Sequence, residues 1–398
     1  MPILPAENRL IAIDLARGIA MLGVALVNVQ GFGATWGSVY GLDLATSVLD
    51  VVAEYSIAVL FTHRSYPVLA FLFGAGLAFQ WRGLPENDRS PARLRSRLWA
   101  LLALGVAHGL LLWPGEILAA YAVIGLLLVT ALRNDNRDLL RLTVILYALN
   151  LALYLWIGSG LMASAALFDS WRNSPASFAS SSWTEAFSRR RVEYVERGLA
   201  QITVIDMWAH VLFGIWAAKS GALQRFIAAP LEHKRVLFAS VALFVLGTGI
   251  ELVAARYGGW SAATINESGE ALMTFGLLPA SVGAIGCWFA FAAMWARQQG
   301  VLASLVIAAG RAPLTQFIGQ SIVFALLFNK TLLGGYGELG RGALTLIAVA
   351  TYLLLCGLVR AWLVGGHAHG PMEILWRRLT KWLSPQPVKT IAIESQTS

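Results

Sequence analysis

The sequence predicts an all-α fold, a polytopic integral membrane helix bundle, and two observations support this prediction. Hydrophobic residues make up 57% of the 398 residues and charged residues only 13%, against about a quarter charged residues in soluble domains. Apolar runs long enough to cross about 30 Å of hydrocarbon recur along the chain, with short polar breaks between most of them. Because these runs do not alternate as barrel strands do, their backbone groups must be paired within helices.

About ten spans are expected from these runs. The segment 44–61 is also apolar, but it carries Asp50 and Glu54. Two acids would be expensive at mid-bilayer and cheap at the headgroups, so this segment is interpreted as an amphipathic helix at the outer interface. An eleventh span is the alternative. The ten predicted spans are 13–33, 64–81, 98–113, 117–132, 139–157, 200–218, 235–255, 271–295, 314–329 and 342–364.

The orientation follows from the basic residues, because short cytoplasmic loops carry an excess of Lys and Arg. With both termini in the cytoplasm, the loops after the second, fourth and sixth spans and the tail after the tenth are basic. The loop 168–198 carries five arginines yet falls outside, but it is long enough for charge counting to lose force. Its Ser-rich stretch, 174–182, is expected to be mobile. Residues 1–385 form one transmembrane domain, and 386–398 form a disordered cytoplasmic tail.

Composition also excludes some functions. The net charge of +8 comes from residues spread over the loops, which predicts no nucleic-acid partner. Cys287 and Cys356 lie inside apolar runs, so neither a disulfide nor a metal site is expected. No spacing of His and acidic residues matches a zinc motif, and no Gly-rich phosphate loop is present.

Two arginine clusters are expected near the cytoplasmic face. Asp14 and Arg17 are three residues apart in the first span, so they share a helix face and can form an ion pair. Arg311 precedes Pro313, which suits the first turn of a helix, so Arg311 should lie beside backbone N–H groups at a positive dipole end. An anion or phosphate site is one interpretation. An orientation anchor with snorkelling arginines is the other.

A histidine and an acid are expected together toward the outer side. His108 lies about a turn below the outer end of the third span, and the short hairpin that follows brings Glu116 close enough to orient the imidazole. His108 is therefore a candidate general base and Glu116 its positioning partner, with a packed core histidine as the alternative. Trp113, at the end of the span, is expected to be an interface anchor.

Further polar residues inside spans are candidates for a substrate cavity. Asp206 and His210 are four residues apart on the sixth span, and Glu251 reaches a similar depth on the seventh. The alternative for these three is interhelical hydrogen bonding without a ligand. The uncharged candidates for the same cavity are Asn28, Gln316 and Gln320.

At these residues the sequence resembles the YeiB family of bacterial inner-membrane proteins, which carry domain of unknown function 418. The resemblance covers almost the whole chain in order, and each motif is weak alone. The matching stretches are 14–18 with Leu22, Gly23 and Asn28, then 66–76, His108 with 113–125, 310–315 with Gln320 and Ser321, and 370–373 with Trp376 and Arg377. Glu116 stands where the family commonly shows Asp, which preserves the charge and lengthens the reach.

That family is distantly similar to transmembrane acyltransferases such as heparan-α-glucosaminide N-acetyltransferase, which also open with an Asp and Arg-Gly pattern. The resemblance implies a cytoplasmic acyl-CoA or acetyl-CoA donor, and a glycan or lipid acceptor that offers a hydroxyl or amine at the other side. Asp14, Arg17 and Arg311 would then bind the donor. The role of His108 as base rests mainly on its own surroundings, because the relatives' histidine need not coincide with it.

Three functions stay open at this point. The first is a membrane acyltransferase of the bacterial inner membrane, and the second is a small-molecule transporter or permease that uses the same polar residues as a path. The sequence shows no internal repeat and no paired broken helices, which mark many secondary transporters. A structural scaffold is the third, since small residues such as Gly74 and Gly76 suit packing between spans. The expected partner is the lipid bilayer, with a homodimer left open.

Overall fold

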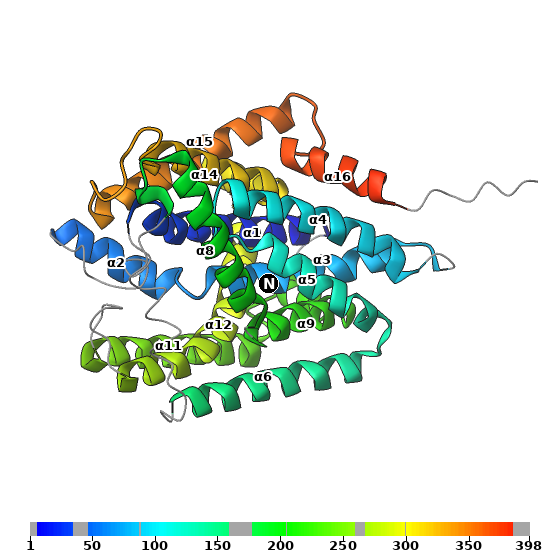
Figure 1. Ribbon diagram of the computed structural model, residues 1–398. Helices are drawn as coiled ribbons and strands as arrows, with labels where there is room; N and C mark the ends of the chain where they lie inside the picture. The colour runs from blue at the N-terminus through cyan, green and yellow to red at the C-terminus, as the bar shows by residue number, and fades with distance from the viewer. Residues whose placement is uncertain are drawn as a thin grey trace, which may run out of the picture.

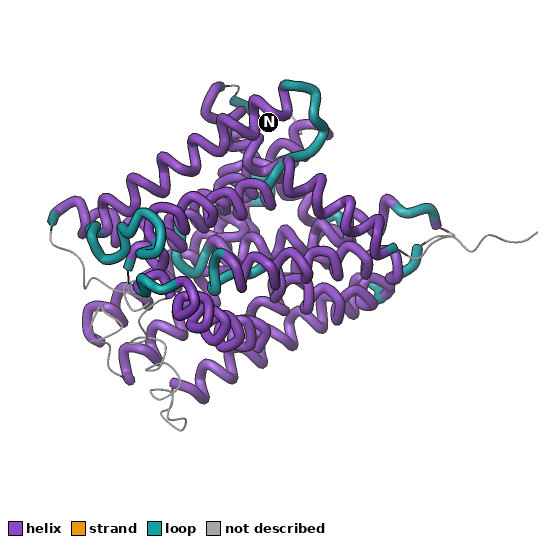
Figure 2. Tube along the Cα trace, turned by 45° about the horizontal axis from the view of Figure 1, so that its top comes forward, coloured by secondary structure: helices purple, strands orange, loops and turns teal. Residues whose placement is uncertain are grey.

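The computed structural model describes residues 6–34, 47–86, 89–158, 177–203, 205–258, 267–298 and 300–384. Within these ranges all regular structure is helical and no strand occurs (Figure 2), which confirms the all-α class. The tail predicted at 386–398 lies outside the described residues. The α-helices are α1 (Ala6–Gly33), α2 (Val48–Leu60), α3 (Ser65–Gly83), α4 (Pro91–Leu111), α5 (Leu118–Leu128), α6 (Asn136–Gly158), α8 (Trp183–Thr203), α9 (Ile205–Lys219), α10 (Ala222–Ala228), α11 (Lys234–Gly258), α12 (Glu267–Trp295), α13 (Val301–Arg311), α14 (Pro313–Phe328), α15 (Arg341–Val364) and α16 (Pro371–Leu383), with short 3-10 helices η3 (Val129–Arg133) and η4 (Ser177–Ala179).

The helices pack into one bundle. Figure 1 shows α6 and α11 along one edge of the bundle and α15 with α16 along the opposite edge, with α1 and α4 between them. The closest helix pairs are α11 with α12, α3 with α9, and α1 with α13, while α16 packs on α4 and α14. The first helix therefore lies at the centre, where it contacts α13, α14 and α15 from the C-terminal part of the chain.

The exposed and buried faces are reversed relative to a soluble protein. On α11 the large apolar side chains of Phe238, Val245 and Leu246 are exposed, whereas Ser240 and Thr248 are buried. The same reversal occurs on α6, where Asn150 is fully buried and neighbouring leucines are exposed. An apolar exposed face with polar side chains turned to the interior is the arrangement expected of helices in contact with lipid. These exposed faces support a membrane protein.

Five helices of the described chain are long and apolar enough to cross a membrane. They are Ile11–Gly33, Val48–Gly83, Lys234–Arg256, Phe275–Trp295 and Arg341–Val364, and a sixth span results if α13 and α14, bent by 94° at their junction, are counted as one. Helices also lie at the remaining predicted ranges. The coarse prediction of a membrane helix bundle thus agrees with the structure.

Helix α2 corrects the interpretation of 44–61 as a helix whose acids lie at the headgroups. Asp50 accepts a hydrogen bond from the Gly342 N–H at 2.7 Å, at the N-terminus of α15. Glu54 forms an ion pair with Arg341 at 2.5 Å, and both side chains are buried. The outward face of α2 is apolar instead, with Val48 and Val52 exposed. Because both acids have partners inside the protein, their charge is no longer an argument against membrane depth.

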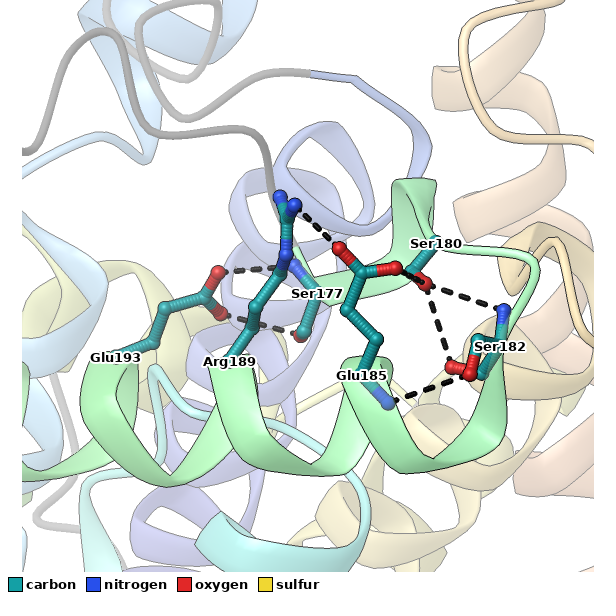
Figure 3. Close-up of polar contacts among 6 residues, drawn as sticks. All are labelled: Ser177, Ser180, Ser182, Glu185, Arg189 and Glu193. Carbon is teal, nitrogen blue, oxygen red and sulfur yellow. Dashed lines mark hydrogen bonds and ion pairs between the residues drawn. The ribbon is translucent and has the colours of Figure 1, made fainter.

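The Ser-rich stretch corrects a second expectation. From Ser177 onward the segment predicted to be mobile is folded onto α8, while its first residues lie outside the described part. The Ser177 N–H and hydroxyl donate to Glu193 at 2.9 and 3.1 Å, and the Ser180 hydroxyl donates to Glu185 at 2.8 Å (Figure 3). The sequence prediction missed α8 because its many charged residues were assigned to a loop. The hydrogen bonds from the serines to Glu185 and Glu193 were not visible in the sequence.

Candidate functional site

Asp14, Arg17 and Arg311 lie together where α1 meets α13. Arg17 Nη1 donates to Asp14 Oδ1 at 3.0 Å and to the Gly310 carbonyl at 2.7 Å, and Arg311 Nε lies 3.6 Å from Asp14 Oδ2. The close approach of α1 and α13 depends on Gly310, because a Cβ there would lie 1.8 Å from the Asp14 carbonyl oxygen. One carboxylate thus holds two guanidinium groups, which leaves a net positive cluster.

Arg311 also lines an open groove. The groove has a volume of about 330 Å³, and the Arg311 side chain is 57% exposed. A second arginine, Arg360, reaches the groove from α15, and sequence reasoning did not single it out. An anion in this groove would meet two guanidinium groups above an apolar floor. The lining residues are Ser304, Ile307, Ala308, Arg311, Arg360, Leu363 and Val364.

The N-terminus of α14 holds an anion supplied by the chain itself. Glu373, from α16, accepts from the N–H groups of Leu314 and Thr315 at 2.7 and 3.3 Å, and from the Thr315 hydroxyl at 2.6 Å. The backbone N–H groups expected beside Arg311 are therefore engaged by a carboxylate. Anion binding near Arg311 would thus depend on the arginine side chains.

His108 and Glu116 lie together under α8. The His108 imidazole is buried, its Nδ1 lies 4.0 Å from Glu116 Oε2, and neither ring nitrogen has a hydrogen-bond partner among the described residues. Glu116 accepts from the N–H groups of Leu118 and Ala119 at 2.8 and 2.9 Å, which caps α5. Gly105 permits α4 to lie close to the first turn of α5, because a Cβ there would lie 2.4 Å from the Ala119 nitrogen.

Burial raises the pKa of the Glu116 carboxyl from 4.5 to about 7, although the Ala119 and Leu118 N–H groups oppose the shift. Since the pKa in the folded state lies above that in the unfolded state, we expect stability to fall as pH rises from 4.5 to about 7 and then to level off. Thermal denaturation midpoints across this range would measure the decline. Glu116→Gln should lack it, and an equal decline in both proteins would contradict the assignment to Glu116.

Trp113 was expected to be an interface anchor, but the structure buries it inside the protein. Its ring is 1% exposed and stacks on Phe32 with centroids 4.0 Å apart. Phe178 of η4 packs against the same Phe32 ring at 4.8 Å. Because α8 and η4 cover the end of α4, the indole faces protein and not the headgroup region. The same cover lies over His108, since Tyr194 of α8 packs on Gly109.

Asp206 and His210 form a second buried polar cluster. Asp206 Oδ2 accepts from the Tyr66 hydroxyl at 3.0 Å, and His210 Nδ1 lies 2.5 Å from the Asp206 carbonyl oxygen. Asp206 Oδ1 and His210 Nε2 have no partner among the described residues, and the Tyr147 ring lies edge-on to His210 at 5.4 Å. The sequence missed both tyrosines, which come from α3 and α6.

Glu251 does not join Asp206 and His210 through any contact that the described residues show. It pairs with Arg64, whose Nη2 lies 2.5 Å from Glu251 Oε2. Arg64 begins the predicted span 64–81, and its side chain is fully buried. The prediction placed Arg64 at a span end, where an arginine can reach water, and the turn between α2 and α3 directs it inward instead.

Two of the remaining cavity candidates hold helices together. Gln316 Nε2 donates to the Tyr352 carbonyl at 3.2 Å, and Gln320 Nε2 donates to the Met21 carbonyl at 3.4 Å. Both side chains are buried between α14, α15 and α1, while Asn28 on α1 is half-buried. These contacts fit interhelical hydrogen bonding. Among the described residues, no group of three or more His, Cys, Asp or Glu side chains could hold a metal ion.

Comparison with known proteins identifies relatives along the whole chain. Residues 217–383, from the end of α9 to α16, match the family model described as "Protein of unknown function (DUF418)". No solved structure matches. The chain is 28% identical to "Uncharacterized protein YeiB" of Escherichia coli, over 94% of this chain and 96% of the relative.

Two relatives from Bacillus extend the comparison. The chain is 26% identical to "Uncharacterized protein YxaH" of Bacillus subtilis, over 96% of each chain. It is 32% identical to an "Uncharacterized 39.9 kDa protein in amylase 3'region" of Bacillus acidopullulyticus, over 31% of this chain and 34% of the relative. Residues 217–383 thus match the DUF418 family, and the chain is similar along almost its whole length to YeiB and YxaH.

Proposed function

We propose that this protein is a multi-pass acyltransferase of the bacterial inner membrane. In this proposal ten spans leave both termini in the cytoplasm, because that arrangement places most basic loops inside. The acyl group moves from cytoplasmic acyl-CoA or acetyl-CoA to a hydroxyl or amine of a glycan or lipid acceptor. The observation that carries the proposal is the His108–Glu116 pair, a buried imidazole beside a carboxylate with both ring nitrogens unpartnered among the described residues.

The chemistry assigns one proton path. His108 takes the proton from the acceptor hydroxyl or amine as its oxygen or nitrogen attacks the thioester carbonyl carbon. Collapse of the tetrahedral intermediate breaks the carbon–sulfur bond, and the departing thiolate takes that proton from His108. Glu116 favours the protonated imidazole between these two events. A buried polar group without a partner is unfavourable, and functional sites are where such groups are retained.

Access to His108 requires α8 to move. The Arg190 side chain of α8 donates to the Leu111 carbonyl at 2.7 Å, and Tyr194 packs on Gly109. Both contacts seal the end of α4 above His108. In the proposed cycle the acceptor displaces this cover, and the donor enters from the groove at Arg311.

The donor site gives a direct binding test. Each charge-assisted hydrogen bond contributes about 1.5–3 kcal/mol, so Arg311→Ala should raise the Kd for coenzyme A by at least about tenfold. Titration of purified protein in detergent micelles would measure it, and Arg360→Ala should act in the same direction. Arg141→Ala is the matched control, since Arg141 is 73% exposed and pairs with Asp138 on its own helix. Equal affinity in all four proteins would remove the donor site.

A transporter is the second candidate, and one observation favours it. Helices α13 and α14 meet at Ala312 with a bend of 94°, and broken helices line the substrate sites of many transporters. Labelled acetyl-CoA supplied to membranes containing the protein would separate the two. Transfer of label to lipid or glycan that His108→Ala lowers by about 100-fold or more supports the acyltransferase. Solute uptake into proteoliposomes that survives His108→Ala, without labelled product, supports the transporter.

A further inference from the structure

A second pocket lies away from these residues, between the turn that joins α2 to α3 and the helices α11 and α12. Its volume is about 50 Å³, which corresponds to roughly three or four water-sized volumes. Neither His108 nor Arg311 lines it. The lining residues are Glu54, Ala58, Val59, Thr62, His63, Arg64, Thr248, Glu251, Leu252 and Met273.

The pocket is lined by the two residues of an ion pair, and each of these residues has one buried polar atom without a partner among the described residues. Arg64 is fully buried, and its Nη atoms donate to the Thr62 carbonyl at 2.6 Å, the Thr248 hydroxyl at 2.9 Å and Glu251 Oε2 at 2.5 Å. Its Nε has no partner among the described residues, and neither does Glu251 Oε1. Each such buried atom is unfavourable by about 1–3 kcal/mol, so a group that satisfies both is stabilising.

The turn that forms one wall is held in a conformation that is unfavourable for its residue. His63 has a φ of 55°, the left-handed region, and is the only residue other than glycine there in the described chain. This turn between α2 and α3 places His63 and Arg64 on the pocket while Thr62 receives the Arg64 hydrogen bond. Strained backbone of this kind costs about 1–3 kcal/mol and clusters at ligand sites.

The charges around the pocket balance. Glu251 opposes Arg64, and Glu54 opposes Arg341 at 2.5 Å. A ligand that carries a full charge would disturb one of these pairs, whereas a neutral ligand would not. A neutral group that donates one hydrogen bond and accepts another suits a pocket of this size, and an alcohol hydroxyl does both.

We propose that this pocket binds the hydroxyl end of a neutral alcohol group, which accepts from Arg64 Nε–H and donates to Glu251 Oε1. A hydroxymethyl group matches the volume, and Val59, Leu252 and Met273 would contact its carbon atoms. Such a group occurs in a free polyol and in the glycerol headgroup of a phospholipid. The inference goes beyond the proposed function, because it concerns binding alone and stands whether or not the protein transfers acyl groups.

Two pairs of probes test it, each differing by hydroxyl groups. Purified protein in detergent micelles is titrated with glycerol and with its trimethyl ether, and separately with phosphatidylglycerol and with phosphatidylmethanol. In at least one pair the hydroxyl-bearing probe should bind at least about tenfold more tightly, because its analogue has no hydroxyl to donate and leaves the buried Glu251 acceptor unsatisfied. Discrimination in the first pair identifies a free polyol site, and discrimination confined to the second identifies a lipid headgroup site.

Two variants locate the binding. Ala58→Leu fills the pocket without touching the ion pair, and Glu251→Gln replaces the accepting carboxylate. Both should reduce the hydroxyl preference at least about tenfold, and Ala58→Leu keeps the test decisive if Glu251→Gln fails to fold. Glu86→Gln is the control, since that side chain is 87% exposed. No discrimination in either probe pair, or discrimination that persists in Ala58→Leu, would overturn the proposal.

Discussion

Gly74→Ala is expected to destabilise the protein by about 3 kcal/mol or more, which is the upper range for overpacking a core. Gly74 lies where α3 crosses α9, and a Cβ there would lie 2.0 Å from the Val211 carbonyl oxygen. The obstacle is backbone on both sides, because a Cβ on Gly214 of α9 would likewise lie 2.0 Å from the Phe71 carbonyl oxygen. The two helices must therefore separate to admit one methyl group. The thermal denaturation midpoint in detergent micelles measures the loss.

Gly76→Ala is the matched control two residues further along α3. A Cβ at Gly76 would meet nothing within 4 Å, so the variant should retain or slightly exceed the parent stability. The sequence interpretation treated Gly74 and Gly76 alike as packing residues, and the structure separates them. Equal midpoints for the two variants would show that α3 and α9 do not approach as closely as described here.

Glu54→Ala is expected to destabilise by about 3–5 kcal/mol, because it leaves a buried arginine without its ion partner. The Glu54 and Arg341 side chains are 5% and 1% exposed and lie 2.5 Å apart, which joins α2 to the start of α15. Asp138→Ala breaks the exposed pair with Arg141 and should change the midpoint little. The same thermal measurement serves both variants.

A paired replacement separates loss of charge balance from loss of packing. Replacing Glu54 with Leu and Arg341 with Met together removes both charges and keeps most of the volume. We expect this double variant to recover much of the stability that Glu54→Ala loses, because a buried ion pair adds little over apolar side chains of similar size. A double variant as unstable as Glu54→Ala would mean that other contacts of these residues hold α2 to α15.

Local patterns in the sequence were sufficient for several features. A helix lies at each range that the apolar runs predicted, since their length and lack of alternation leave no other way to pair the backbone. The three-residue spacing of Asp14 and Arg17 predicted a contact that occurs at 3.0 Å. The short hairpin after His108 predicted that Glu116 would lie close to it, as it does at 4.0 Å. In each case the partners are near in sequence, so helix geometry alone decides the distance.

Contacts between distant segments were not predictable in the same way. Glu373 was quoted only as part of a family stretch, and nothing in its neighbourhood shows that it caps α14. Arg64 was placed only as the first residue of a predicted span, although it pairs with Glu251, 187 residues further along the chain. Asp50 and Glu54 were assigned to the headgroups because an unpaired acid is unfavourable inside a membrane. Their partners lie far along the chain, so the sequence did not show what offsets that cost.

The sequence by itself determined that this protein is an all-helical membrane bundle similar to YeiB, because hydropathy and the order of motifs depend on the sequence alone. Only the tertiary structure decided which polar side chains meet. It places Arg311 with Asp14, Arg360 on the same groove, and Arg64 with Glu251 in a separate pocket. The physical reason is that a charge in a low-dielectric interior is tolerated only beside its counter-charge, and which helix brings that counter-charge is set by packing across the bundle.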